Sequence, residues 1–547
     1  MGLFFALVIC FVLDLSVVRS ARILAVFPSL FYSHHLFYRN YIDAFLDEGH
    51  EIVLVTPCST YSKGEIPRNL TLIDVRNVSL NLWTEGSAKI IAESQNNVQM
   101  SQGIFELIVQ IIGKQLQTDE IKNLIGDKNK TFDLLLTEAF IKTTLIISHY
   151  FKIPVLEISS LGQLYGDFEN IGAPVQPLLY PRPQRKRIYN LTIIEEISEL
   201  YKDFQISNLH LEKLAGNSNE VLKNTPFGST PSINILQNNV HMLFLNSHPV
   251  WETNRPVPLS VLYAFGVHQK PYSKLPQDLL TYLESSVNGV VYVAFGTTAN
   301  ICQYSAKMQV LLNAFSQLPY DFLLKWPEDE LPGKPENVKI AKWFPQADLL
   351  KHPKIKAFIT QGGLQSTDEA IQAGVPLIGI PLIWDQWGNA EGYVRHGIGV
   401  KLEMEHITEE QLIEAVNAVV TDDSYRRNTA RLRALLRDAP QRPLERALWW
   451  TRYLLRHGGA SHLRAPAANM SYAEYFELEL CLILFSVLFI CSILLYCCLR
   501  FVFEKYVILL YKQCFVGLKS KFMNVKYRYI YFFPKVFETG CLRKPAN

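Results

Sequence analysis

The sequence lacks three patterns that would each assign it to a broad functional class. No Cys or His pairs stand at metal-ligand spacing, which argues against a metal site. No G-x-G-x-x-G follows a predicted strand, which weakens a dinucleotide-dependent dehydrogenase. The formal charge is only +2, from 53 Lys and Arg against 51 Asp and Glu, so nothing global points to nucleic acid. We therefore expect no metal, no redox cofactor and no nucleic-acid partner.

Cysteine is scarce where a disulfide framework would need it. Of nine cysteines, only Cys58 and Cys302 fall between the two long apolar runs of the chain. One disulfide could form between them, but a fold held together by disulfides is excluded. With 547 residues, the chain is long enough to bury two or three separate cores.

The two long apolar runs predict a secreted-pathway protein with one membrane span. Residues 1–20 have the length and the small residues before a cleavage point that are typical of a signal peptide. Residues 479–499 contain a charge-free run that would span about 30 Å as a helix, the thickness of a bilayer core. Residues 500–547 contain ten Lys and Arg against two Glu, so this basic tail is expected in the cytosol. The chain is thus predicted to be a single-pass type I protein of the endoplasmic reticulum membrane, with its large domain in the lumen.

Glycosylation sequons support the same orientation, because all of them precede the predicted span. They begin at Asn69, Asn77, Asn129, Asn190 and Asn469.

Between the apolar runs, short buried strands alternate with helical stretches, and the pattern occurs twice. Strands are expected at Arg22–Phe27, Glu51–Thr56, Phe132–Thr137 and Ile153–Ile158, and again at Gly289–Gly296, Asp321–Trp326, Val338–Trp343, Lys356–Thr360 and Pro376–Pro381. A Pro-marked stretch separates the two series. The sequence therefore predicts an α/β protein of two doubly wound domains with a cleft between them. Their expected bounds are 21–250, a linker at 251–276, and 277–440, followed by C-terminal helices and a membrane-proximal segment at 441–478.

The most informative segment is "WFPQADLLKHPKIKAFITQGGLQSTDEAIQAGVPLIGIPLIWDQWGNA", residues 343–390. Gly362 and Gly363 lie between a predicted strand and a predicted helix, where backbone N–H groups and the helix dipole favour a diphosphate. Trp343 offers a flat surface for a base, and Glu369 can accept hydrogen bonds from ribose hydroxyls. Asp385 and Gln386 are expected near the same strand ends. An ordinary strand–turn–helix would explain the glycines alone, but not this combination.

This segment resembles the donor-binding motif of the membrane-bound UDP-glycosyltransferases, and in particular of their insect-type members. The resemblance covers roughly residues 21 to 500. It implies the GT-B fold, in which one Rossmann-like domain binds the acceptor and the other binds the nucleotide sugar. The sugar nucleotide is then a co-substrate, and neither a cofactor nor a metal is required.

The resemblance also assigns roles to individual residues. Trp343 would stack on uracil, Gln346 would contact its edge, and Glu369 would bind ribose. The Gly362–Gly363 loop would hold the diphosphate together with Ser366, with Thr297 facing the phosphates from another strand end. Asp385 and Gln386 would hold sugar hydroxyls. Two positions depart from many family members, which have His where this chain has Gln361 and Asn where it has Gln365; both stay candidate donor-binding residues.

The first strand is followed by "FYSHHLFYRN", in which two histidines are adjacent. Transfer to a hydroxyl needs a base, and a neutral imidazole suits that task at neutral pH. The resemblance selects His34 as the catalytic base and implies a carboxylate partner at Glu138, where the family usually has Asp. His35 is the competing candidate, because only one of two adjacent side chains can point into the cleft.

Together these features predict an inverting transfer of a hexose, with glucose as the expected sugar, from a UDP-sugar to a hydroxyl of a small lipophilic acceptor such as a flavonoid, steroid or xenobiotic, a detoxification-type reaction. Arg255 matches a position where an Arg can meet the carboxylate of UDP-glucuronate, so it leaves the donor open. The alternative is a lumenal binding protein for lipophilic ligands with weakened catalysis. The sequence leaves the acceptor and a homo-oligomer open.

Overall fold

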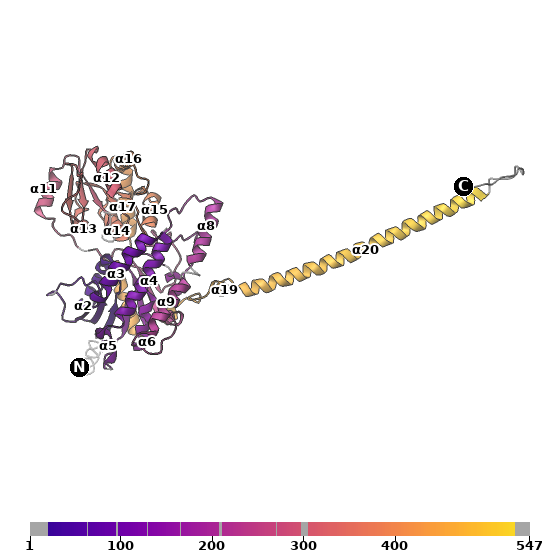
Figure 1. The fold of residues 1–547 in the computed structure, drawn as a ribbon, viewed down its shortest axis with the longest axis horizontal. Helices are drawn as coiled ribbons and strands as arrows, with labels where there is room; N and C mark the ends of the chain where they lie inside the picture. The colour runs from indigo at the N-terminus through magenta and orange to yellow at the C-terminus, as the bar shows by residue number, and fades with distance from the viewer. Residues whose placement is uncertain are drawn as a thin grey trace, which may run out of the picture. The chain divides into compact units, whose positions relative to one another are not determined.

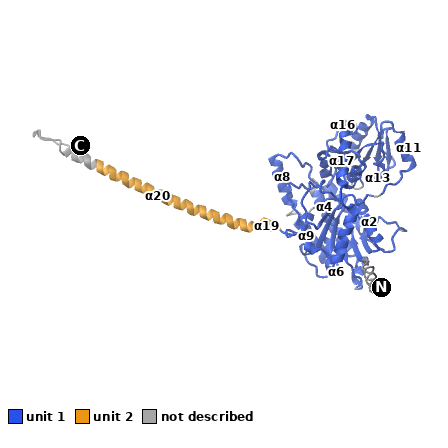
Figure 2. Ribbon diagram, turned by 180° about the vertical axis from the view of Figure 1, so that it is seen from behind, with its two compact units in different colours: residues 1–470 blue, residues 471–547 orange. Residues whose placement is uncertain are grey.

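The computed structural model describes residues 20–530 apart from residue 63, residues 95–96, residue 128, residue 165, residues 207–210, residue 270 and residues 297–304. The predicted signal-peptide residues 1–19, Thr297 and the last residues of the tail therefore lie outside the described residues. The chain divides into two compact units, residues 1–470 and residues 471–547 (Figure 2). The first unit contains both of the sheets described below, and the second contains the apolar C-terminal helix.

The first sheet has seven parallel strands in the order β3-β2-β1-β4-β5-β6-β7. They are β1 (Arg22–Val26), β2 (Glu51–Thr56), β3 (Leu70–Asp74), β4 (Leu134–Glu138), β5 (Val155–Ser159), β6 (Val240–Leu245) and β7 (Val261–Tyr263). The helices of this half are α2 (Tyr32–Asp47), α3 (Arg76–Glu93), α4 (Asn97–Gln115), α5 (Asp119–Gly126), α6 (Ile146–Phe151), α7 (Asp167–Ile171), α8 (Ile193–Phe204), α9 (Leu211–Lys223) and α10 (Ile233–Leu236).

The second sheet has six parallel strands in the order β10-β9-β8-β11-β12-β13. They are β8 (Val290–Ala294), β9 (Asp321–Lys325), β10 (Val338–Ala341), β11 (Ile355–Thr360), β12 (Leu377–Gly379) and β13 (Gly399–Lys401). Its helices are α11 (Gln277–Ser285), α12 (Ser305–Ser316), α13 (Gln346–Leu349), α14 (Leu364–Ala373), α15 (Gln386–Arg395), α16 (Glu409–Thr421) and α17 (Asp423–Arg437). Figure 1 shows these helices around the second sheet, and α2 to α6 together with α9 around the first, while α8 projects to the side.

Both sheets have the doubly wound strand order of dinucleotide-binding folds, and the order explains where a site forms. In each sheet the chain starts in the middle, runs to one edge, and then returns to build the other side. The two strands at this reversal are β1 and β4 in the first sheet, and β8 and β11 in the second. The loops that leave such a pair turn in opposite directions and open a crevice at the carboxyl ends of the strands.

The strands are buried because helices cover both faces of each sheet. Every residue of β4, β5 and β8 is buried, as expected of parallel strands in an α/β layer structure. Apolar side chains form one core on each face, and four such cores together fill the first unit.

Nine predicted strands are present, with ends shifted by a few residues, but two features of the connection differ from expectation. The predicted linker contains β7, which pairs with β6 at the edge of the first sheet. Helix α18 (Pro443–His457) returns to the first half, where Ala447 and Leu454 share a core with Phe37 and Phe45 of α2. A capping box formed by Thr408 and Gln411 opens α16.

The second unit contains the short α19 (Tyr472–Tyr475) and the 53-residue helix α20 (Leu478–Ile530). Residues Leu478–Lys521 are long and apolar enough to cross a membrane, by length and composition. The helix does not end at residue 499, where the predicted span ends, but continues through the basic segment that follows.

Candidate active site

A cavity of about 430 Å³ is lined by residues from both halves of the first unit. This volume is within the usual range for small-molecule sites. The first half contributes mainly apolar side chains: Phe31, Leu36, Phe140, Leu161 and Leu164, together with Ser33 and His34. The second half contributes mainly polar or aromatic ones: Lys325, Trp343, Gln346, Gln361, Gln365, Ser366, Glu369, Trp384, Asp385 and Gln386.

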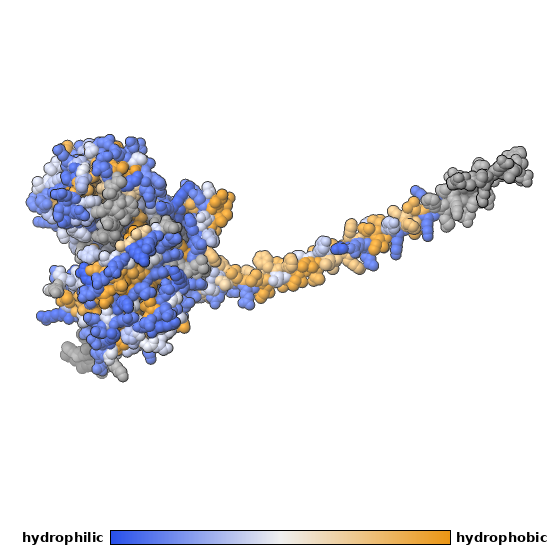
Figure 3. All heavy atoms as spheres, viewed as in Figure 1, coloured by the Kyte–Doolittle hydropathy of each residue, from blue (hydrophilic) through white to orange (hydrophobic). Residues whose placement is uncertain are grey.

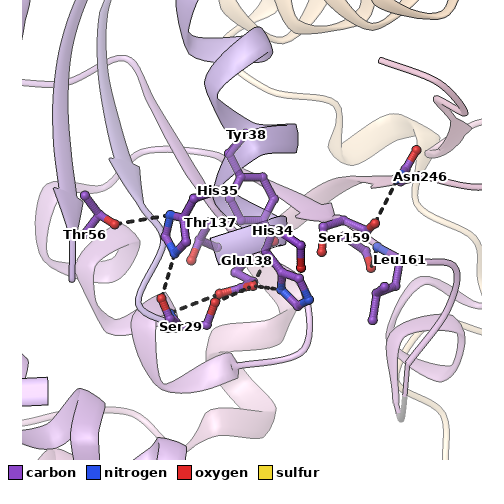
Figure 4. A network of polar contacts seen from close by, with 12 residues as sticks. Ser29, His34, His35, Tyr38, Thr56, Thr137, Glu138, Ser159, Leu161 and Asn246 are labelled. Atoms are coloured by element: carbon purple, nitrogen blue, oxygen red, sulfur yellow. Dashed lines mark hydrogen bonds and ion pairs between the residues drawn. The ribbon is translucent and has the colours of Figure 1, made fainter. Parts of the chain in front are cut away.

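His34 and Glu138 come together at the strand reversal of the first sheet. His34 lies in the first turn of α2, just after β1, and Glu138 is the last residue of β4. Their side chains meet with His34 Nδ1 2.8 Å from Glu138 Oε1 (Figure 4). His34 lines the cavity, whereas Glu138 is fully buried behind it and does not. The pair is therefore arranged with the imidazole between the carboxylate and the cavity.

Glu138 is held by several donors besides His34. Tyr38 Oη donates to Oε1 at 2.8 Å, Ser29 Oγ donates to Oε1 at 3.0 Å, and Ser29 N lies 3.3 Å from Oε2. Burial alone would raise the pKa of Glu138, but the hydrogen bond and positive charge of His34 outweigh it and hold this pKa below its usual value. An ionised carboxylate only accepts hydrogen bonds, so Nδ1 of His34 is the donor in this contact. Whenever the imidazole is neutral, Nε2 is then the nitrogen that keeps a lone pair.

His35 points away from this pair. Its Nε2 lies 2.7 Å from the carbonyl oxygen of Ser29, and its Nδ1 lies 3.3 Å from Thr56 Oγ1 (Figure 4). Burial lowers its pKa. It does not line the cavity. Both ring nitrogens of His35 thus have partners within the first half.

The loop after β11 presents backbone to the cavity at the strand reversal of the second sheet. Gly362 has φ +90°, and a Cβ there would lie 3.0 Å from the carbonyl oxygen of Gln386. Only glycine fits this conformation and this close approach. Gly363 is the N-cap of α14, and because it has no side chain it leaves the first N–H groups of that helix uncapped. Gln361 and Gly363 line the cavity, while Gly362 shapes the turn behind it.

Gln346 joins the predicted nucleotide residues into one hydrogen-bonded group. Its amide nitrogen donates to Ser366 Oγ at 2.9 Å and to Glu369 Oε2 at 2.8 Å. Its oxygen accepts from Tyr292 Oη at 3.1 Å. Burial raises the pKa of Glu369 to about 7, against the hydrogen bond from Gln346. Glu369 is therefore poised to change its charge near neutral pH.

Asp385 and Gln386 open α15 beside the same loop. Burial raises the pKa of Asp385 to about 6, while a hydrogen bond from Asn389 and the charge of His34 oppose the rise. The oxygen of Gln386 accepts from the backbone of Leu382 and Ile383, both at 2.9 Å. Only its amide nitrogen is left for a ligand. Gln386 therefore fixes the loop that carries Asp385 as well as lining the cavity.

Asn389 is a functional candidate that sequence reasoning missed. Its amide nitrogen donates to Asp385 Oδ2 at 2.8 Å and to the carbonyl oxygen of Gly362 at 2.9 Å, and its oxygen accepts from Trp251 Nε1 at 3.0 Å. It thereby links the Asp385 carboxylate, the glycine turn and the connecting segment. The signal was present in the "NA" that ends the motif, although no spacing argument pointed to this role.

Gln365 makes a contact between the two halves. Its amide nitrogen donates to the carbonyl oxygen of Ser33 at 2.7 Å. Ser33 precedes His34, so this bond joins the first turn of α14 to the first turn of α2. The side-chain amide of Gln365, which is expected to bind the UDP-sugar, thus links the start of α14 to the start of α2.

Trp343 follows β10 and lines the cavity with 58% of its surface exposed. The ammonium of Lys325 lies 4.5 Å from the centre of its ring. Thr297, the remaining predicted donor residue, lies outside the described residues.

Trp384 is a second residue that the sequence did not single out. It has φ +60°, a conformation that costs a bulky residue about 1–3 kcal/mol. Its ring reaches the first half, 6.2 Å from the ring centre of Phe31 and 5.5 Å from that of Phe105. Phe31 in turn lies 5.0 Å from the His34 ring. Trp384 therefore joins the loop of Asp385 to the aromatic wall beside His34.

Arg255 does not line the cavity. Its Nη1 donates to Gln163 Oε1 at 2.8 Å and its Nη2 donates to the carbonyl oxygen of Tyr180 at 3.0 Å. The guanidinium also stacks on Phe168. The hydrogen bonds and the ring contact of this arginine thus lie within the first half.

Within the described ranges, no group of three or more His, Cys, Asp or Glu residues could hold a metal ion.

This geometry agrees with comparisons to known proteins. The family model for UDP-glucoronosyl and UDP-glucosyl transferases matches residues 22–513. The chain belongs to this family. Ecdysteroid UDP-glucosyltransferase of Spodoptera littoralis nuclear polyhedrosis virus is 34% identical over 500 residues, covering 87% of this chain and 96% of the viral protein. UDP-glycosyltransferase UGT5 of Dactylopius coccus is 30% identical over 493 residues, covering 88% of this chain and 91% of the insect protein.

Solved structures confirm the predicted GT-B fold. The glycosyltransferase of kitacinnamycin superposes with a TM-score of 0.55 at 16% identity, covering 79% of this chain and 99% of that one. The calicheamicin glycosyltransferase CalG4 gives 0.52 at 15% identity, with coverage of 80% and 99%. This UDP-glycosyltransferase thus has two α/β halves, each with a parallel sheet, around its cavity. It also has an apolar C-terminal helix.

Proposed function

We propose that this UDP-glycosyltransferase transfers glucose, with inversion, from UDP-glucose to a hydroxyl of a small lipophilic acceptor. The observation that carries the proposal is the His34–Glu138 pair, in which His34 lines a cavity shared with the Asp385 loop. Nε2 of His34 takes the proton of the acceptor hydroxyl, and Glu138 stabilises the imidazolium that forms. The hydroxyl oxygen bonds to C1 of the sugar while the bond from C1 to the UDP oxygen breaks, and its electron pair leaves with UDP. A single displacement of this kind inverts C1 and gives a β-glucoside.

In this proposal, different residues of the second half bind the uracil, the ribose and the diphosphate of the donor. Trp343 stacks on uracil, Gln346 lies beside its edge, and Glu369 accepts from ribose. Gln361, Gly363 and Ser366 surround the diphosphate at the start of α14, where uncapped N–H groups favour negative charge. Because Gln361 is neutral, stabilisation of the leaving UDP rests on these N–H groups.

The choice of glucose rests on charge. Among the described residues that line the cavity, the Lys and Arg side chains are Lys325 and Lys351. Lys325 lies over Trp343, and Lys351 is 3.6 Å from Asp348 of α13, so both belong to the nucleobase end. A glucuronate carboxylate beside Asp385 would have no cation, and an unpaired charge of this kind costs several kcal/mol. The viral relatives are named UDP-glucosyltransferases, in line with this choice.

The proposed acceptor class is based on the wall of the cavity that the first half contributes. Phe31, Phe140, Leu161 and Leu164 form an apolar surface next to His34, which suits a phenol or steroid rather than a sugar or peptide. The viral relatives are named ecdysteroid transferases, so a steroid belongs in any acceptor panel.

Membranes that contain the enzyme provide the test. With UDP-glucose and a panel of phenols and steroids, we expect UDP release and a glucoside whose anomeric coupling in proton NMR is that of the β form. In competition, UDP-glucose should be used at least about tenfold better than UDP-glucuronate, equivalent to about 1.4 kcal/mol. Acceptor binding without UDP release would favour the alternative of a lumenal binding protein, and an α-glucoside would contradict the single displacement.

We further propose that α20 anchors the enzyme as a type I protein of the endoplasmic reticulum membrane, with the first unit in the lumen. The excess of Lys and Arg after residue 500 supports this orientation. Protease added to sealed microsomes should then shorten only the tail, whereas loss of the first unit would reverse the topology.

A further inference from the structure

Helix α8 is amphipathic, but its apolar side faces outward. Ile193, Ile194, Ile197 and Tyr201 are 75%, 80%, 61% and 61% exposed, respectively. Their spacing places them on one side of the helix. Figure 3 shows the corresponding hydrophobic surface over α8. A helix on the surface of a soluble protein would normally turn such a stripe to the core.

The charged side of α8 is instead the side that is held by the protein. Each of three acidic residues on the helix pairs with an arginine from the segment before it. The pairs are Arg187–Glu195 at 2.8 Å, Arg185–Glu199 at 3.0 Å, and Arg182–Asp203. Arg185 and Asp203 are buried. These ion pairs fix the orientation of the helix, because rotating it to bury the isoleucines would leave buried charges without partners.

The chain leaves the first unit on the same side. The N–H of Asn469, one residue before the unit ends, donates to the carbonyl oxygen of Glu169 at 3.1 Å. The side chain of Glu169 accepts from Arg182 Nη2 at 3.0 Å, and Arg182 also pairs with Asp203 of α8. Two residues, Glu169 and Arg182, therefore connect the exit of the chain to α8.

The distance from this exit to a bilayer is limited by chain length. The candidate span begins at Leu478, and only residues 471–477 separate it from the first unit. Fully extended, such a segment reaches about 25 Å. Once α20 is inserted, the side of the unit that carries α8 is therefore held close to the lipid surface.

From these observations we propose that α8 lies flat in the membrane interface and forms a second membrane contact of the enzyme. Ile193, Ile194, Ile197 and Tyr201 enter the boundary between headgroups and acyl chains, as in other interfacial amphipathic helices. The ion pairs behind the helix keep its acidic side on the protein and away from lipid. The inference rests on the proposed anchoring by α20.

The test uses the full chain reconstituted in phosphatidylcholine vesicles, with a protease site placed within residues 471–477. The uncut chain should sediment with the vesicles, and failure to do so would remove the anchor and this inference together. After cleavage, the first unit should stay on the vesicles. The double substitution Ile194→Asp and Ile197→Asp should lower its vesicle partition at least about tenfold, since each places a charge where the proposal puts an exposed isoleucine against lipid. If the unsubstituted first unit left the vesicles as completely as the variant does, α8 would have no role in membrane binding. The anchoring by α20 would be unaffected by that result.

A matched control and a cross-linking measurement separate lipid from protein partners. Val287 is 88% exposed in the other half, so Val287→Asp should leave the partition unchanged. The double variant of α8 should keep its turnover with a water-soluble acceptor, which shows that it is folded. A photoreactive benzoyl-phenylalanine at position 194 should form lipid adducts in vesicles, and one at position 287 should not. Cross-linking of two copies at position 194 instead of lipid adducts would assign the surface to self-association and overturn the proposal.

Discussion

The two halves of the first unit build their shares of the cavity in different ways. In the second half, the candidate residues from Trp343 to Gln386 lie in one continuous stretch of sequence, on the loops after β10, β11 and β12 and on the helices that follow them. In the first half, His34 and Glu138 are 104 residues apart and meet only because β1 and β4 pair in the sheet. Both sites nevertheless form at the strand reversal of a doubly wound sheet, where crevices open. The fold thus places the two sites proposed here for proton removal and for anion binding by the same rule.

The two halves also differ in how fully the hydrogen-bonding capacity of their buried carboxylates is used within the protein. Glu138 accepts three hydrogen bonds at its Oε1, including the one from His34, and is fixed before any ligand arrives. Glu369 and Asp385 have pKa values raised to about 7 and about 6 by burial, so each gains stabilisation when a hydroxyl donates to it. We interpret the first half as a rigid base and the second as a binding surface that adapts to its ligand.

The largest expected effect comes from the first half. His34→Ala should lower turnover about 10²–10⁴-fold, the usual contribution of a positioned general base, while UDP-glucose affinity measured by calorimetry stays nearly the same. His35→Ala is the neighbouring control, because His35 bonds only within the first sheet. Full activity of His34→Ala combined with inactivity of His35→Ala would reverse the assignment.

The corresponding change in the second half is Asp385→Asn. It keeps the shape of the side chain but removes the charge that sugar hydroxyls bind, so transfer should fall about 10- to 100-fold, the worth of a hydrogen bond to a charged group. UDP itself should bind as before, since uracil and diphosphate contacts lie elsewhere. If UDP affinity fell as much as turnover, Asp385 would be shaping the Gly362 loop through Asn389 rather than holding the sugar.

Trp384 tests the boundary between the halves. Trp384→Gly relieves the positive φ but removes two aromatic contacts of about 0.5–1.5 kcal/mol each and the packing of the indole against the core, so the free energy of unfolding should fall. The KM of a small phenol should rise about tenfold, the consequence of losing about 1.4 kcal/mol of binding, while the KM of UDP-glucose changes little. Trp384→Phe keeps an aromatic ring and should recover part of the loss. Equal changes in both KM values would mean that Trp384 holds the whole cleft instead of the acceptor wall.

The smallest effect should appear in the pH dependence of donor binding. If Glu369 binds ribose as proposed, it accepts most strongly when it is ionised, and burial raises its pKa to about 7. Donor affinity should therefore be full above pH 7 and decline as the pH falls through that value. Because the neutral carboxyl keeps part of the contact, the KM of UDP-glucose should be about fivefold higher at pH 6 than at pH 8. Glu369→Gln should flatten this profile. An unchanged slope in that variant would assign the titration to another group, such as Asp385.

Sequence alone predicts the second half better than the first, for a physical reason. A diphosphate site requires glycine and free backbone N–H groups in one strand–turn–helix, so its signature is local. The base requires a carboxylate from another strand, and only the family resemblance pointed to Glu138. The Gln365–Ser33 bond and the contacts of Trp384 could not be predicted, because they depend on how the two halves pack. The spacing of residues 193–204 indicates an amphipathic helix, but the outward direction of its apolar side depends on distant arginines.

The central claim is that His34 removes the acceptor proton, and it can be tested with two acceptors of similar shape but different acidity. A phenol that ionises by itself near neutral pH, such as 4-nitrophenol, needs little help from a base, whereas an aliphatic alcohol such as benzyl alcohol needs much. The measurement is the loss of kcat/KM caused by His34→Ala for each acceptor. We predict a loss at least about tenfold smaller for the acidic phenol, within the range that general-base catalysis contributes. Equal losses for both acceptors would contradict the account, because they would mean that His34 shapes the cavity without taking the proton.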